Sequence, residues 1–162
     1  MNHPVHETAE TMRPSLPHDE PACQRNAAWL GYAGLLPFVA LAALVLLSAG
    51  DIQVQARTAL IAYGAVIISF LGAWHWYAAI ELGGSSATLA RMSFAVSPAL
   101  LGWLAILLSH PYGMALVITG LLMTCVADGR WRATSRPWYR QLRQRRTLIA
   151  TASMTAAVFS QL

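Results

Sequence analysis

Five long apolar segments constrain the fold of this chain more than any other feature. A helix needs about 20 apolar residues to cross the hydrocarbon core of a bilayer. The composition allows this, because 56% of the residues are hydrophobic and only 11% are charged. We therefore predict an all-α fold, a polytopic membrane helical bundle with about five transmembrane helices. The predicted spans are residues 28–49, 57–80, 88–109, 112–128 and 147–161.

The fifth predicted span, residues 147–161, has the least support. It has about 15 residues, fewer than a spanning helix requires. A helix that lies on the membrane surface is therefore an alternative for this segment. Several hydroxyl side chains also lower its hydropathy, namely Thr147, Thr151, Ser153, Thr155 and Ser160.

The arginines predict how the chain is threaded. All 11 basic residues are arginines, and most of them lie in the connection 129–146 before the last span. Basic loops face the cytoplasm by the positive-inside rule. We therefore expect a multi-pass protein of the bacterial inner (cytoplasmic) membrane. Its N-terminus and the 81–91 turn would be cytoplasmic, and the 50–56 loop, the 109–112 turn and the C-terminus periplasmic.

The first 26 residues differ from the rest of the chain. They are polar, contain four prolines and lack an apolar core like that of a signal peptide. We predict a disordered cytoplasmic tail at 1–26, followed by a transmembrane domain at 27–162 that includes the basic cytoplasmic loop 129–146.

Two prolines lie within predicted spans. Pro37 and Pro98 are expected to kink their helices, since proline has no N–H to donate. The carbonyls left without a partner, at Ala33 and Phe94, must then find another donor at membrane depth. The kinks either shape the bundle or leave a cavity between the two helices.

The second span carries His75 between two tryptophans. Helical phase puts Gly64, Gly72 and His75 on one face, together with Ile68, which predicts that the histidine faces protein in a central helix. Trp74 and Trp76 are about 200° apart around the helix. We expect one of the two to pack inside the bundle and the other to meet lipid.

Ionisable residues collect at the cytoplasmic ends of the spans. Buried charges are costly in a membrane unless they are paired. We therefore predict a polar cluster of Glu81, Arg91 and Asp128, in which one of the two carboxylates pairs with Arg91. The alternative is that each charge extends separately toward water.

The basic connection also carries aromatic side chains, as interfacial segments do. We predict that this loop contacts membrane lipids through their anionic headgroups. Nucleic acid is the other ligand of basic, aromatic segments, but a location between two spans argues against it. The predicted lipid-contacting residues are Arg130, Arg132, Arg136, Trp138, Tyr139, Arg140 and Arg143.

The sequence gives little support for catalysis or a cofactor. A haem with two histidine ligands is not expected, because His75 and His110 should lie about 25 Å apart on opposite membrane faces. No hydrolase, metalloprotease or nucleotide-binding motif occurs. We predict a protein that is not an enzyme, with no metal site and no cofactor.

Several motifs resemble those of a known family. The segments "LGYAGLLPFVALA", "YGAVIISFLGAWHW", "SPALLGWLAILL" and "PWYRQLR" are similar to domain-of-unknown-function family 3429, the bacterial relatives of transmembrane protein 69. The resemblance covers residues 28–150 and implies an inner-membrane protein without an established activity. Ala73 and Trp74 depart from the family pattern. The positions that match it are Pro37, Gly72, His75, Trp76, Pro98, Trp103, Asp128, Pro137, Trp138, Tyr139 and Arg143.

Two functional hypotheses follow. The first is a non-enzymatic scaffold or accessory subunit that contacts lipid and partner helices, or a second copy of itself. The second is a binding protein for a quinone, tetrapyrrole or sterol, in analogy to the tryptophan-rich translocator proteins, with which the chain shares no motif. The residues predicted to line the cavity of the second are Trp74, His75, Trp76, Ser97 and Trp103.

Overall fold

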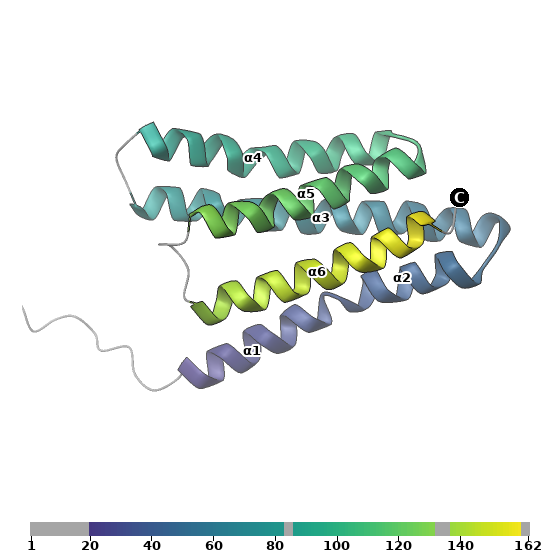
Figure 1. Cartoon of the computed structure of the whole chain (residues 1–162), viewed down its shortest axis with the longest axis horizontal. Helices are drawn as coiled ribbons and strands as arrows, with labels where there is room; N and C mark the ends of the chain where they lie inside the picture. Colours follow the sequence, from purple (N-terminus) through teal and green to yellow (C-terminus); the bar gives the residue numbers. More distant parts are fainter. Residues whose placement is uncertain (1–19, 83–85, 132–136, 160–162) are drawn as a thin grey trace, which may run out of the picture.

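The chain folds into a helical bundle. A computed structural model describes residues 20–82, 86–131 and 137–159, and within these ranges the chain is almost entirely helical. Figure 1 shows helices that run side by side along one long axis. The predicted all-α membrane bundle is thus confirmed. The helices are α1 (Glu20–Ala33), α2 (Leu36–Leu47), α3 (Gly50–Leu82), α4 (Ser86–Leu107), α5 (His110–Arg130) and α6 (Pro137–Phe159).

Four helical segments of the described chain are long and apolar enough to cross a membrane: α1 with α2, then α3, α4 and α5. The fifth predicted segment, residues 147–161, is not among them. Its residues up to Phe159 form the second half of α6, and the first half of that helix is rich in arginine. By length and composition alone, therefore, four helical segments of the described chain qualify as spans, and α6 does not.

The prediction of a loop at residues 50–56 is wrong, because these residues form the first turns of α3. Gly50 has φ +62°, a conformation that glycine adopts without a steric penalty, and it makes a tight turn out of α2. The Gln53 side chain then donates to the Val45 carbonyl at 2.8 Å. With 33 residues, α3 is about 50 Å long and extends beyond an apolar core of about 30 Å.

Two further boundaries differ from the prediction. Residues 20–26, expected in the tail, are the start of α1, where Pro21 suits a first helical turn. Residues 1–19 lie outside the described part. Most of the predicted loop 129–146 is also helical, because α5 continues to Arg130 and α6 begins at Pro137.

The two prolines differ in their effect on the helix. Pro37 divides the first span, since α1 ends at Ala33 and α2 begins at Leu36. The Tyr63 hydroxyl donates to the carbonyl of Gly34 at 2.8 Å. The acceptor is thus one residue beyond Ala33, whose carbonyl was predicted to need a donor. Pro98 lies inside a continuous α4. The Ser97 hydroxyl donates to the Phe94 carbonyl at 2.7 Å, as that prediction requires.

Tyr63→Phe tests the bond at the helix break. The substitution removes one hydroxyl and leaves the Gly34 carbonyl without its side-chain donor, so we expect the free energy of unfolding to fall by about 1 kcal/mol. Thermal unfolding in mild detergent measures this. Tyr77→Phe, at an exposed tyrosine of the same helix, is the control. Equal losses in the two variants would show that the bond contributes nothing.

The predicted central position of α3 is confirmed, since it packs against α2, α4 and α5. Small residues allow this close approach. A Cβ at Gly72 would lie 2.5 Å from the Ala95 carbonyl oxygen in α4, and one at Gly64 would lie 2.5 Å from Val117 Cγ1 in α5.

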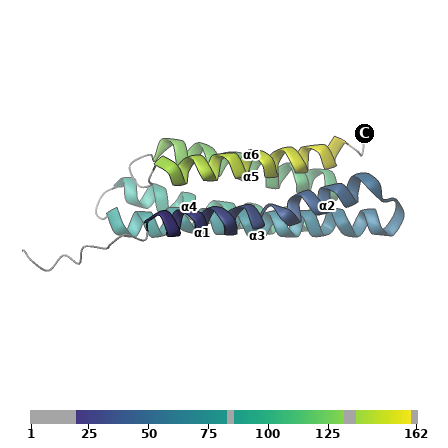
Figure 2. The same ribbon diagram turned by 90° about the horizontal axis from the view of Figure 1, so that it is seen from below.

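The last helix, α6, packs against α5 and α2, and Figure 2 places it on the face of the bundle opposite to α3. Figure 1 also shows that α6 begins at the end of the bundle where α5 stops. One face of α6 is buried, which joins the last helix to the core of the bundle. The buried residues of this face are Arg143, Thr147, Ala150, Met154 and Ala157.

Candidate functional site

Four helices meet at a group of buried ionisable side chains, here termed the buried charge cluster: His75 of α3, Arg91 of α4, Asp128 of α5 and Arg143 of α6. Their exposed fractions are 1%, 4%, 8% and 6%. The Asp128 carboxylate lies at the centre. Its Oδ1 is 3.2 Å from His75 Nε2, and its Oδ2 accepts from Arg143 Nε at 2.8 Å. The cluster therefore links α3, α5 and α6 through one carboxylate.

Aromatic rings enclose the imidazole of His75. Its ring centroid lies 5.1 Å from that of Phe94 and 5.3 Å from that of Trp131. The approach of Nε2 to Asp128 is within ion-pair distance, but neither ring nitrogen has a well-aligned hydrogen bond within the described chain. His75 thus faces protein, as predicted, and its Nε2 contacts the Asp128 carboxylate of α5 without an aligned hydrogen bond.

Arg91 belongs to the cluster as predicted, and Glu81 does not. The Arg91 guanidinium lies 5.4 Å from the centroid of the Trp131 ring and is attracted by the charge of Asp128. Glu81 is exposed. It follows His75 by six residues, about 240° around the helix, so it projects away from the cluster.

The lipid-facing position predicted for Arg143 is wrong. Its side chain is buried, and besides Asp128 it reaches the Leu71 carbonyl at 3.5 Å. The cause is helical phase, since Arg143 shares one side of α6 with the buried Thr147 and Ala150. The spacing of Arg143, Thr147 and Ala150 indicates a buried face only if these residues belong to one continuous helix. The prediction of a loop at 129–146 hid this spacing.

The other predicted loop residues differ in exposure. Arg130 is exposed, whereas Trp138, Tyr139 and Arg140 are partly buried. Arg132 and Arg136 lie outside the described residues.

The five residues predicted to line a ligand cavity are not brought together. Trp76 and Trp103 are 45% and 63% exposed, and Ser97 is bonded to its own helix. Trp74 packs against Tyr139 at 5.5 Å between ring centroids. The two tryptophans beside His75 therefore separate as predicted, with Trp74 inside and Trp76 outside.

His110 lies at the opposite end of the bundle from His75. Its Nε2 is 2.9 Å from the Thr58 hydroxyl near the start of α3. Along that continuous helix, Thr58 and His75 are about 25 Å apart. The two histidines cannot share an iron, in agreement with the spacing expected from the sequence.

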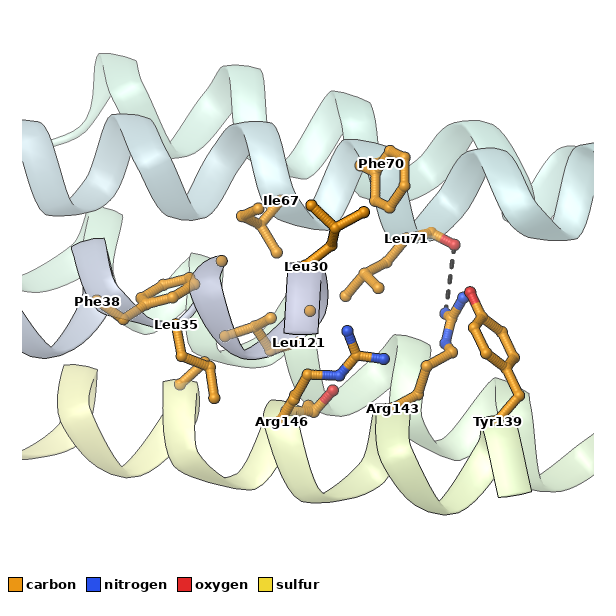
Figure 3. Close-up of a pocket in the computed structure, with 14 residues that line it drawn as sticks. Leu30, Leu35, Phe38, Ile67, Phe70, Leu71, Leu121, Tyr139, Arg143 and Arg146 are labelled. Carbon is orange, nitrogen blue, oxygen red and sulfur yellow. Dashed lines mark hydrogen bonds between the residues drawn. The ribbon is translucent and has the colours of Figure 1, made fainter. Parts of the chain in front are cut away.

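A cavity of about 170 Å³ lies beside the charge cluster, between α6 and the first helices. Figure 3 shows Arg143 and Tyr139 at one end, Phe38 and Leu35 at the other, and Arg146 between them. His75 is not among its lining residues. These are Leu30, Gly31, Gly34, Leu35, Phe38, Ile67, Phe70, Leu71, Leu121, Tyr139, Arg143, Arg146, Thr147 and Ala150.

The fold and the charge cluster define a polytopic helical membrane protein. The chain belongs to the family described as protein of unknown function (DUF3429), which it matches over residues 23–159. This confirms the resemblance drawn from the motifs.

Two curated relatives of the chain are named transmembrane protein 69. The protein of Xenopus tropicalis is 35% identical over 139 residues, covering 84% of this chain and 54% of the relative. The protein of Mus musculus is 30% identical over 137 residues, covering 83% of this chain and 56% of the relative. The chain spans about half the length of these relatives. No solved structure was found to match it.

Proposed function

We propose that the protein is a non-enzymatic scaffold or accessory subunit of the inner membrane, which presents a rigid surface to lipid and to partner helices. The observation that carries this proposal is the buried charge cluster. All the ionisable side chains that are buried within the described chain lie in it. Their contacts hold helices together, which is a structural use of groups that could otherwise serve chemistry.

The small-residue face of α3 is not free to bind a partner. The small residues of α3 at Gly64 and Gly72 are used inside the bundle. Exposed apolar side chains remain on the outer face of α4, where Leu100, Trp103 and Leu107 are each at least 60% exposed. In a bilayer this face meets lipid or a partner helix.

Purification in mild detergent tests the scaffold proposal. A photoreactive amino acid at exposed Trp103 is expected to cross-link to a partner membrane protein or to a second copy, and one at buried Phe38 to neither. Mass spectrometry identifies the products, and an absorption spectrum is recorded on the same sample. A stoichiometric chromophore or quinone, or equal cross-linking from both positions, would contradict the proposal.

We also propose that the arginine-rich end, where α6 begins, faces the cytoplasm. The ends of the helices support this, since α1 and α6 begin at the same end and α6 finishes at the other (Figure 1). Reporter fusions after Phe159 and between α5 and α6 are expected to be periplasmic and cytoplasmic, respectively. A cytoplasmic reporter after Phe159 would refute this orientation.

A further inference from the structure

We propose that the cavity beside the charge cluster is a binding site for an anionic phospholipid: it takes a segment of one acyl chain, and Arg146 holds the phosphate. This inference goes beyond the scaffold proposal and does not depend on it. It is carried by the shape, the lining and the charge of the cavity.

The walls and the size of the cavity suit a single hydrocarbon chain. Most lining side chains are apolar, and they come from α1, α2, α3 and α5 as well as α6. The volume of about 170 Å³ is close to the roughly 150 Å³ of an apolar protein cavity that holds benzene. It is smaller than the roughly 300 Å³ at which sites for drug-sized ligands begin. A chain segment therefore fits, whereas a tetrapyrrole or a sterol ring system does not.

The cavity opens sideways. Leu30 of α1 and Phe70 of α3 belong to its lining and are 76% and 71% exposed. A phospholipid of the surrounding bilayer can therefore insert one chain between α1 and α3 while its second chain stays in the membrane. This is the reason for assigning the site to a lipid of the bilayer.

Positive charge is in excess at one end of the cavity. Arg143 and Arg146 line this end, and the Asp128 carboxylate pairs with Arg143. The Arg146 side chain makes one hydrogen bond, from Nε to the Leu142 carbonyl at 3.1 Å, and no ion pair with a described residue. An anionic headgroup would supply a charge partner for the Arg146 guanidinium.

Gly31 makes room for this arginine. A Cβ at Gly31 would coincide with the Arg146 guanidinium, so the absence of a side chain in α1 lets Arg146 lie against the helix backbone. The guanidinium is thereby held at the cavity, between its apolar end and Arg143, as Figure 3 shows. The phosphate would then lie nearer the start of α6 and the acyl chain further along the helix. This is the order of headgroup and chain within one leaflet of the bilayer.

Native mass spectrometry of the delipidated full chain tests the proposal, with phosphatidylglycerol and phosphatidylcholine of identical acyl chains as probes. We expect the wild type to retain phosphatidylglycerol preferentially. Arg146→Gln should lower this preference by about fivefold, the effect of one arginine near an anionic lipid. Arg145→Gln is the matched control, because it removes the same charge at an exposed neighbour and should leave the preference unchanged.

Two further variants keep the test informative if Arg146→Gln is unstable. Arg146→Lys retains the charge and should retain most of the preference. Gly31→Ala should lower the preference by displacing the guanidinium, while Gly129→Ala, at a glycine that does not line the cavity and whose added Cβ would meet nothing within 4 Å, should not. Equal effects of the Arg145 and Arg146 variants, or no preference in the wild type, would each overturn the proposal.

Discussion

Asp128→Asn is expected to lower the free energy of unfolding by about 3 kcal/mol, because removing one partner of a buried ion pair leaves the other charge uncompensated. Asparagine keeps the shape of the side chain but not its charge. Arg143, at 2.8 Å from the carboxylate, would lose its counter-ion inside the bundle. Thermal and denaturant-induced unfolding in mild detergent measure the loss.

Glu81→Gln is the matched control for this prediction. It removes the same charge near the same end of the bundle, but Glu81 is exposed, so we expect a change within about 0.5 kcal/mol. A double-mutant cycle of Asp128→Asn with Arg143→Gln should give a coupling energy of about 1–3 kcal/mol. If the Asp128 and Glu81 variants are equally stable, the cluster does not hold the helices together.

Gly72→Ala should also be strongly destabilising, by about 1–3 kcal/mol, because it overpacks a close helix contact. The added methyl would lie 2.5 Å from the Ala95 carbonyl oxygen and 3.1 Å from Pro98 Cγ. A backbone oxygen cannot move aside as the end of a long side chain can, so α3 and α4 must separate. The same unfolding measurements report this change.

Gly129→Ala provides the opposite case within the same protein. Gly129 is helical, and a Cβ there would meet nothing within 4 Å. Alanine should then be neutral or stabilising by up to about 1 kcal/mol, from its higher helix propensity. A loss of stability at Gly129 as large as that at Gly72 would mean that helix contact distance does not explain the effect.

Much of the architecture could be predicted from local sequence patterns. Apolar length predicted the spans that became α3, α4 and α5, and helical phase placed His75 inside and put Trp74 and Trp76 on different sides of the helix. Proline chemistry predicted the donor that the Phe94 carbonyl requires, which the structure provides at Ser97. These features are local, since each depends on residues within a few turns of one helix.

The errors concern helix ends and partners. Residues 50–56 and 137–146 are polar enough to resemble loops, but they extend helices whose other turns are packed in the bundle. The ligand cavity was expected beside His75, where aromatic rings fill the space instead. The cavity that the structure contains is lined by Arg143 and Arg146, and His75 is not among its lining residues.

The sequence alone determined that this is an all-α membrane protein with His75 on a protein-facing helix side and an arginine-rich end. The partners of the buried charges were decided only by the tertiary structure. Asp128 could have paired with several arginines, and its contacts with His75 and Arg143 depend on how α3, α5 and α6 are rotated and packed. The physical reason is that helical periodicity fixes which residues share a face, whereas the relative placement of helices is set by close packing between segments distant in the chain.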